Sequence, residues 1–257
     1  MLMERNRSLM LIGSALKGYA VEATDGRIGT VEDFLFNDLT FKVRWLVVDT
    51  GNWLPGRKVL IHPSAIVQTP QAREADYEEE QLAVRLTMAQ VKASSSILED
   101  APVSLQMEGS LYGYYGWDPL WGGDGSFGAY PDERLAAELE AERLDRADPH
   151  LRSMNAVTGY HIRATDGTVG HVENFLIDRA TGEIRYLIVD TMNWWFGQPV
   201  LISPYAVRDI SWEDQQVRVN VSRQQIKASP AWKPEEMIDR AYEQHLHGYY
   251  GWPGYDW

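Results

Sequence analysis

The chain has 257 residues, of which 44% are hydrophobic, so it is long enough to bury either one large core or two small ones. A net charge of −13 gives a surface that repels phosphate backbones, which argues against nucleic acid as a partner. The absence of cysteine excludes disulfides, and no stretch approaches the roughly 20 apolar residues that span a bilayer, so we expect a cytoplasmic protein, either free or at the cytoplasmic face of a membrane.

A tandem repeat organises the chain, because residues 18–66 match residues 159–207 without a gap and 25 of the 49 positions are identical. Further along, the offset between the copies falls from 141 to 135, which places six extra residues in an acidic loop at 72–81. The match then extends to an aromatic stretch, 112–117 in the first copy and 247–252 in the second. Two copies of one fold are therefore expected.

Each copy begins with a predicted β-hairpin. Asp25-Gly26 and Asp166-Gly167 stand between β-like runs, and Asp-Gly favours a type I′ turn, in which both central residues take positive φ. Regular short strands separated by Gly and Pro predict a small all-β barrel or sandwich. The strands expected in the first copy, each with a counterpart in the second, are 28–36, 43–50, 58–61 and 82–86.

A short helix is expected to close each barrel. Thr87 with Gln90, and Ser222 with Gln225, have the hydroxyl-x-x-amide spacing of a capping box, in which two side chains satisfy the free amides of a first helical turn.

Two longer helices are expected outside the barrels. Acidic residues and an i, i+4 leucine pair after Pro131 predict an exposed helix at 131–147. A second helix is expected at 234–247, and the residues predicted on its apolar face are Met237, Ile238, Ala241, Tyr242 and His245.

The predicted fold is thus dominated by β-structure, with two duplicated small barrels and short helices in the linker and the C-terminal tail. The expected domains are a first barrel at 8–100, an aromatic, glycine-rich and helical linker at 101–152, a second barrel at 153–230 and a helical and aromatic tail at 231–257.

The repeated residues resemble a known family. Gly-Tyr-x-(Ile/Val)-x-Ala-Thr-Asp-Gly begins at Gly18 and Gly159, and Arg-(Trp/Tyr)-Leu-(Ile/Val)-Val-Asp-Thr begins at Arg44 and Arg185. This pattern resembles the PRC-barrel family, which includes the cytoplasmic domain of the photosynthetic reaction centre H subunit and the C-terminal domain of the ribosome maturation factor RimM. The resemblance implies a small barrel that docks on larger assemblies. The chain departs from the H subunit by lacking its membrane helix and by having two barrels, and from RimM by lacking that factor's other domain.

No catalytic, cofactor or metal site is expected. Residues 123–128 match G-x-G-x-x-G, but their flanks provide neither the strand nor the helix that a dinucleotide site needs. Asp49 and Asp190 follow equivalent strands, where capping of the next turn explains them better than acid–base chemistry. His245 and His247 stand two residues apart and therefore do not face each other on a helix.

Tyrosine and tryptophan clusters are the candidate partner-binding residues, because such side chains supply large contact areas while their polar tips stay hydrated. The alternative is that each aromatic tail packs on its own barrel. The candidate residues are Trp53, Trp117, Trp121, Trp194, Trp195, Tyr249, Tyr250, Trp252 and Trp257.

We therefore expect a non-catalytic docking or scaffold subunit. The resemblance implies, most specifically, an H-type cytoplasmic component of a photosynthetic reaction centre or a similar membrane complex, with integral membrane subunits as partners. One alternative is a free, soluble, self-associating PRC-barrel protein with a role in stress. A further alternative is a RimM-like ribosome-associated factor, which the acidic charge disfavours. Peripheral membrane contact and homo-oligomerisation remain open, and neither nucleic acid nor a cofactor is expected.

Overall fold

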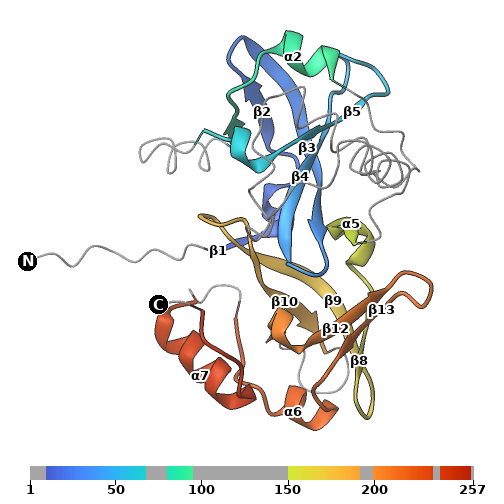
Figure 1. Ribbon diagram of the computed structural model, residues 1–257, viewed down its shortest axis with the longest axis vertical. Coiled ribbons are helices and arrows are strands. Elements are labelled where there is room, and N and C mark those ends of the chain that lie inside the picture. The colour runs from blue at the N-terminus through green and yellow to red at the C-terminus, as the bar shows by residue number, and fades with distance from the viewer. Residues whose placement is uncertain (1–9, 68–79, 95–149, 192–198, 234–237, 256–257) are drawn as a thin grey trace, which may run out of the picture. The chain divides into compact units, whose positions relative to one another are not determined.

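The computed structural model describes residues 10–67, 80–94, 150–191, 199–233 and 238–255. The chain divides into two compact units, and each is built around one sheet (Figure 1). We call them the first-repeat unit, residues 16–39 and 43–151, and the second-repeat unit, residues 1–15, 40–42 and 152–257. The linker helix predicted at 131–147 lies outside the described residues.

The sheet of the first-repeat unit has the strand order β5-β4-β3-β2-β6. Strand β2 is antiparallel to β3 and parallel to β6, and β4 is antiparallel to β5. Its strands are β2 (Ala20–Ala23), β3 (Gly26–Asn37), β4 (Lys42–Asp49), β5 (Lys58–Ile61) and β6 (Gln81–Ala83). The short helices in this part of the chain are η1 (Gly13–Leu16), η2 (Pro63–Ala65) and α2 (Met88–Ala93).

The sheet of the second-repeat unit repeats this order as β11-β10-β9-β8-β13 and adds β12 beside β13. The prediction of two duplicated barrels of like topology is thereby confirmed. The strands are β8 (His161–Ala164), β9 (Gly167–Asp178), β10 (Ile184–Asp190), β11 (Val200–Ile202), β12 (Val207–Ser211) and β13 (Gln216–Val219). Strand β7 (Leu151–Ser153) belongs to the other sheet, where it pairs with β3. The remaining elements are α5 (Met154–Val157), η3 (Pro204–Ala206), α6 (Arg223–Lys227) and α7 (Arg240–Tyr250).

Strand β1 (Met10–Ile12) completes the second-repeat sheet, although it precedes the first repeat in the chain. It pairs antiparallel with the last residues of β9, from Leu176 to Asp178. Strand β8 pairs with the beginning of β9, and β10 occupies the other edge. Strands β1 and β8, which are distant in sequence, therefore pair with different parts of the same edge of β9.

The central strands are buried on both faces, as their continuous apolar runs predict. Trp45, Leu46, Val47 and Val48 are consecutive buried residues of β4, and β10 shows the same run in the second-repeat unit. A strand with one face in water would instead alternate between apolar and polar residues.

The two Asp-Gly hairpins are present, but the type I′ assignment is wrong. Ala23 pairs with Gly26, so Thr24 and Asp25 form the turn. Gly26 has a φ of +149°, whereas Asp25 is not among the described non-glycine residues with positive φ. A Cβ at Gly26 would lie 2.7 Å from the sulfur of Met88, a flexible side chain that would have to shift, and the positive φ itself disfavours a larger residue.

The aspartate of each turn instead fastens the helix that closes its barrel. Asp25 Oδ1 accepts a hydrogen bond from the backbone N–H of Met88 at 2.7 Å, and Asp166 Oδ1 accepts one from Arg223 at 2.7 Å. These donors are the first residues of α2 and α6, whose amides have no partner within the helix. Both predicted capping boxes are also confirmed. The repeated Asp is therefore a helix-fixing residue, which explains why it recurs in both copies.

A second repeated glycine is required by close backbone packing. A Cβ at Gly29 would lie 2.0 Å from the carbonyl oxygen of Asp49, and one at Gly170 would lie 1.9 Å from that of Asp190. Contacts this short would force the backbones of adjacent strands apart.

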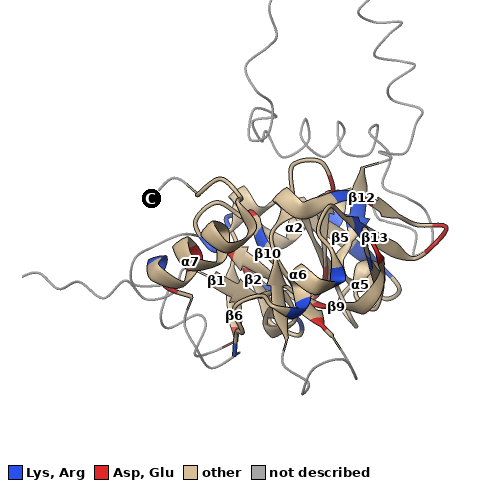
Figure 2. Ribbon diagram, turned by 90° about the horizontal axis from the view of Figure 1, so that it is seen from below, with Lys and Arg blue, Asp and Glu red and all other residues tan. Residues whose placement is uncertain are grey.

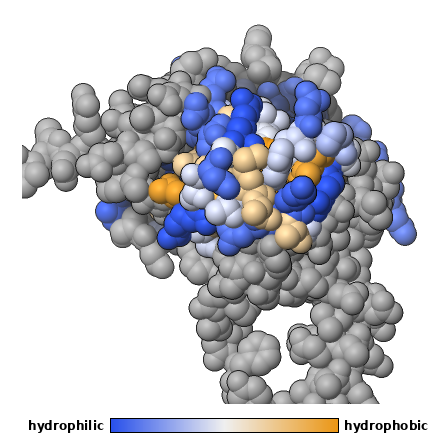
Figure 3. Space-filling model, turned by 90° about the horizontal axis from the view of Figure 1, so that it is seen from above, coloured by the Kyte–Doolittle hydropathy of each residue, from blue (hydrophilic) through white to orange (hydrophobic). Residues whose placement is uncertain are grey.

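Charges are mixed on the described surface. Arg218 forms ion pairs with Asp209 and Asp214, so acidic and basic residues lie together on the β12–β13 hairpin (Figure 2). Figure 3 shows a face of the first-repeat unit where hydrophilic residues surround a few apolar ones. Within the described ranges, no helix combines the length and the apolar composition required to cross a bilayer.

Replacing Gly29 with Ala is expected to destabilise the protein by more than about 2 kcal/mol, because the added methyl group meets backbone that cannot rotate away. Gly248→Ala is the matched control, since that glycine lies in α7 with open space around its Cα, and it should stabilise by about 0.5–1 kcal/mol. Both are measured by urea unfolding followed by circular dichroism. An unchanged midpoint for Gly29→Ala would contradict the close strand approach.

Candidate docking site

Helix α7 brings the C-terminal aromatic residues onto the second-repeat sheet. Its start is fixed by Asp239, whose carboxylate accepts a hydrogen bond from the N–H of Tyr242 at 2.8 Å. Its end is fixed by Gly251, which has a left-handed φ of +72° and allows the N–H of Trp252 to bond the carbonyl of His247. The chain then turns back towards the sheet.

The buried face of α7 differs from the predicted one. Ile238 is buried and Tyr242 is half-buried, as predicted, but Ala241 and His245 are exposed, and Leu246 and His247 are buried instead. The pattern missed this face because it contains polar residues, Glu243 and His247, whose polar ends are hydrogen-bonded within the unit. The predicted start of the helix at 234–237 lies outside the described residues.

Apolar packing attaches the helix to the sheet. One cluster joins β9, β10 and β11 to α7 and to the segment before it, and its buried members are Leu176, Tyr186, Ile188, Leu201, Trp232, Ile238 and Leu246. Half-buried side chains pack around it, namely Met10, Ile12, Tyr242, Tyr250, Trp252 and Tyr255. The aromatic tail therefore covers its own sheet.

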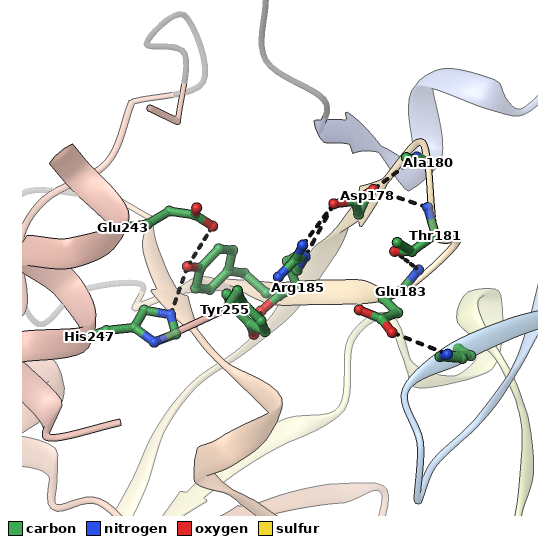
Figure 4. Close-up of polar contacts among 10 residues, drawn as sticks. Asp178, Ala180, Thr181, Glu183, Arg185, Glu243, His247 and Tyr255 are labelled. Atoms are coloured by element: carbon green, nitrogen blue, oxygen red, sulfur yellow. Dashed lines mark hydrogen bonds and ion pairs between the residues drawn. The ribbon is translucent and has the colours of Figure 1, made fainter. Parts of the chain in front are cut away.

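A polar chain runs through this apolar cluster (Figure 4). The hydroxyl of Tyr186 lies 3.0 Å from Glu243 Oε1 and 2.8 Å from His247 Nε2. The other ring nitrogen of His247 lies 2.6 Å from the carbonyl oxygen of Pro253. We call these four groups the Tyr186 chain. Burial raises the pKa of Tyr186 above its ordinary value, so its phenol stays protonated.

Arg185 lies beside the Tyr186 chain and links it to the end of β9. Its guanidinium donates two hydrogen bonds to Asp178 Oδ2, at 2.9 and 3.3 Å. It also stacks over the ring of Tyr255, with 4.0 Å between the guanidinium carbon and the ring centroid. The hydroxyl of Tyr255 donates to the carbonyl of Arg185 at 2.8 Å and accepts from Ser203, also at 2.8 Å. The tail is thus fixed at several points.

The first-repeat unit has a different arrangement at the position equivalent to Tyr186. Trp45 occupies it, and the ring of His62 meets the indole edge to face, with 5.5 Å between the centroids. Burial, followed by the charge of Arg44, lowers the pKa of His62 to about 4, so this imidazole is neutral at physiological pH. The equivalent of His62 is Ser203, so both positions changed between the copies.

The described candidate partner-binding residues fall into two groups. Tyr250 and Trp252 stack at 4.0 Å between centroids and pack on the unit's own cluster, as the packing alternative expects. Tyr249 is 40% exposed, although its hydroxyl donates to the carbonyl of Gln225. Trp53 is half-buried in the loop after β4. The candidates outside the described residues are Trp117, Trp121, Trp194, Trp195 and Trp257.

The other residues that the sequence singled out have structural roles where they are described. Asp49 Oδ1 accepts a hydrogen bond from the N–H of Gly51 at 2.8 Å, which confirms its turn-capping role. His247 is buried and His245 is exposed, so they do not meet. The described ranges contain no group of three or more possible metal ligands among His, Cys, Asp and Glu. The G-x-G-x-x-G match at 123–128 lies outside those ranges.

Sequence reasoning missed Tyr186, Arg185, Asp178 and Tyr255 as parts of one site. A usable signal was present where the copies differ, because the second copy has Tyr for Trp45 and Asp for Asn37. The first change replaces an N–H that only donates with a hydroxyl that donates and accepts, and the second replaces a neutral amide with a charged carboxylate.

Comparison with known proteins identifies the repeated unit. A family model described as PRC-barrel domain matches the chain twice, over residues 10–79 and 155–226, which together make up more than half of the sequence. A search of curated proteins found no match.

Replacing Trp252 with Ala is expected to destabilise the second-repeat unit by about 2–3 kcal/mol, because the stacked, half-buried ring leaves a gap beside α7. Tyr249→Ala is expected to cost less, about 1 kcal/mol, since 40% of that side chain is exposed and the change removes one hydrogen bond. Urea unfolding by far-UV circular dichroism compares the two. Equal losses of unfolding free energy in the two variants would mean that the stack of Trp252 on Tyr250 does not hold the tail on the sheet.

Proposed function

This chain belongs to the PRC-barrel family, and we propose on that basis that it is a non-catalytic docking protein. The observation that carries the proposal is the match of the family model to both repeats, together with the same strand order in both sheets. Two copies of one barrel give a protein two related surfaces, and such duplication suits a scaffold better than it suits an enzyme with one catalytic site.

The roles of the charged groups support the non-catalytic assignment. Asp25 and Asp166 hold helices, Asp49 caps a turn, and Glu32 forms an ion pair with Lys58 at 2.9 Å. Each of these carboxylates therefore has a structural partner.

Exposed aromatic residues are the proposed contacts with a partner. Tyr249 is 40% exposed and meets Tyr250 edge to face, and Tyr205 is 44% exposed and lies 5.6 Å from the ring of Tyr255. Exposed tyrosines supported by packed aromatic neighbours lose little conformational entropy on binding, which favours them as anchors. Trp53, half-buried in the first-repeat unit, is the proposed contact there.

The most specific proposal is an H-type cytoplasmic component of a photosynthetic reaction centre or a similar membrane complex, with integral membrane subunits as the partners. It is supported by the family resemblance, the acidic composition and the exposed tyrosines. In this role the barrels would cover the cytoplasmic ends of those subunits.

A free, self-associating protein is the second candidate. Trp212 is 68% exposed and Leu39 is 69% exposed, and large apolar side chains in water favour contacts between copies. A RimM-like ribosome factor is disfavoured, because a net charge of −13 repels ribosomal RNA.

The full-length chain, tagged in its native cells, is expected to co-purify with pigment-bearing membrane subunits identified by mass spectrometry. Tyr249→Ala and Trp53→Ala should each reduce the recovered partner at least about tenfold, because one buried aromatic anchor often contributes about 2 kcal/mol. Circular dichroism should show both variants folded.

Trp212→Ala is the matched control for the membrane-subunit role, because it removes an exposed aromatic residue that is not among the contacts proposed with those subunits, and it should leave their recovery unchanged. Recovery of the chain alone, with sedimentation that depends on concentration, would favour self-association. Recovery of ribosomal proteins would favour the RimM-like role.

A further inference from the structure

The hydrogens of the Tyr186 chain can be assigned from its geometry. The carbonyl of Pro253 only accepts hydrogen bonds, so the His247 nitrogen that lies 2.6 Å from it, Nδ1, must carry a hydrogen. The other nitrogen, Nε2, faces the hydroxyl of Tyr186 at 2.8 Å, and the same hydroxyl faces Glu243 at 3.0 Å. A tyrosine hydroxyl supplies one hydrogen, yet two contacts need one each.

One additional proton is therefore required. With Glu243 ionised and His247 neutral, Tyr186 can donate to only one of them, and the other contact brings two acceptors together. A proton on Glu243 restores both bonds, because the acid donates to the hydroxyl and the hydroxyl donates to the imidazole. A proton on His247 Nε2 also restores both, with every donation reversed. The geometry requires one of these two states.

The surroundings favour the proton on Glu243. Burial has the largest effect on Glu243 and raises its pKa from the ordinary 4.5, and the nearby charge of Asp178 acts in the same direction. The hydrogen bond with Tyr186 and the charge of Arg185 lower this pKa but do not reverse the shift. Burial has the largest effect on His247 too and lowers its pKa from the ordinary 6.5; the hydrogen bond with Pro253 raises it, and the charge of Arg185 lowers it.

The groups that face His247 remove it from water. The rings of Tyr186, Tyr205, Trp252 and Tyr255 surround it, with centroids 4.9–6.2 Å from its own. The charged groups nearby are Glu243, on the other side of the Tyr186 hydroxyl, and Arg185, whose charge disfavours an imidazolium.

We propose that Glu243 is a carboxylic acid in the folded protein, that it donates a hydrogen bond to Tyr186, and that Tyr186 donates one to His247. The additional proton, carried by Glu243, thereby completes the hydrogen bonds that fasten α7 to the sheet. The attachment of the C-terminal helix then responds to pH. This inference is independent of which partner the protein binds.

The direction of the pH effect follows from the two shifts. The raised pKa of Glu243 contributes stability that is fully present below 4.5 and is lost as pH rises through the raised value. The lowered pKa of His247 contributes stability that is present above 6.5 and is lost as pH falls through the lowered value. The Glu243 contribution therefore weakens towards alkaline pH.

Glu243→Gln tests the proposal in the full-length protein. The glutamine amide donates to Tyr186 without taking up a proton, so it reproduces the protonated acid at every pH. Hydrogen exchange of the α7 amides measures the opening of the helix from pH 4.5 to 8. The ratio of the opening constant of the wild type to that of the variant should rise with pH above about 4.5, by up to about tenfold per pH unit.

Glu213→Gln, which changes an exposed carboxylate, should give a ratio that does not vary with pH. Greater opening of Glu243→Gln than of the wild type at every pH would overturn the proposal, because Glu243 would then accept as a carboxylate. Nitrogen-15 NMR of His247 in the wild type gives a second readout that requires no variant. We expect a neutral ring with its hydrogen on Nδ1 near pH 6, and an imidazolium there would also overturn the proposal.

Discussion

The side chain of Tyr186 is completely buried, and its hydroxyl group therefore needs hydrogen-bond partners. Leaving such a group unpaired costs about 1–3 kcal/mol. Glu243 and His247, one turn apart on α7, supply the partners, and Leu246 on the same helix is part of the sheet cluster. A helix shifted by one residue would lose both hydrogen bonds. The register of α7 on the second-repeat sheet thus depends on this hydroxyl, while Tyr255 fixes the segment that follows the helix.

The two repeats show which parts of a small barrel tolerate change. Turn aspartates, close-packed glycines and capping boxes recur in both copies, because each is fixed by backbone geometry. The positions that differ include Trp45 against Tyr186, whose rings contact other side chains. His62 and Ser203 also differ, yet each accepts a hydrogen bond from a backbone N–H at the start of η2 or η3. A tryptophan beside a neutral imidazole and a tyrosine within a hydrogen-bonded group are alternative ways to fill one site.

The sequence predicted the fold well because its strongest signals were local or repeated. The duplication, the strands and both capping boxes each depend on short-range geometry or on internal identity. The turn type was missed because Asp25 bonds an amide 63 residues further along the chain, and no local pattern reports such a contact. The face of α7 was predicted only in part, because Glu243 and His247 are polar residue types, yet Glu243 is half-buried and His247 is buried. Pattern reading assigns burial by residue type, and it fails where a buried polar group finds a specific partner.

Strand β1 has a consequence for how the chain is made. Its partner in β9 begins at Leu176, 164 residues after Ile12, so β1 leaves the ribosome long before the sheet that receives it exists. Closing so long a loop costs entropy that short hairpins avoid, although the cost grows only slowly with length. Proteins generally fold domain by domain during synthesis, whereas the second-repeat unit needs both an early and a late part of the chain. Its assembly therefore follows the synthesis of β9, and β1 cannot pair until residues 176–178 have been translated.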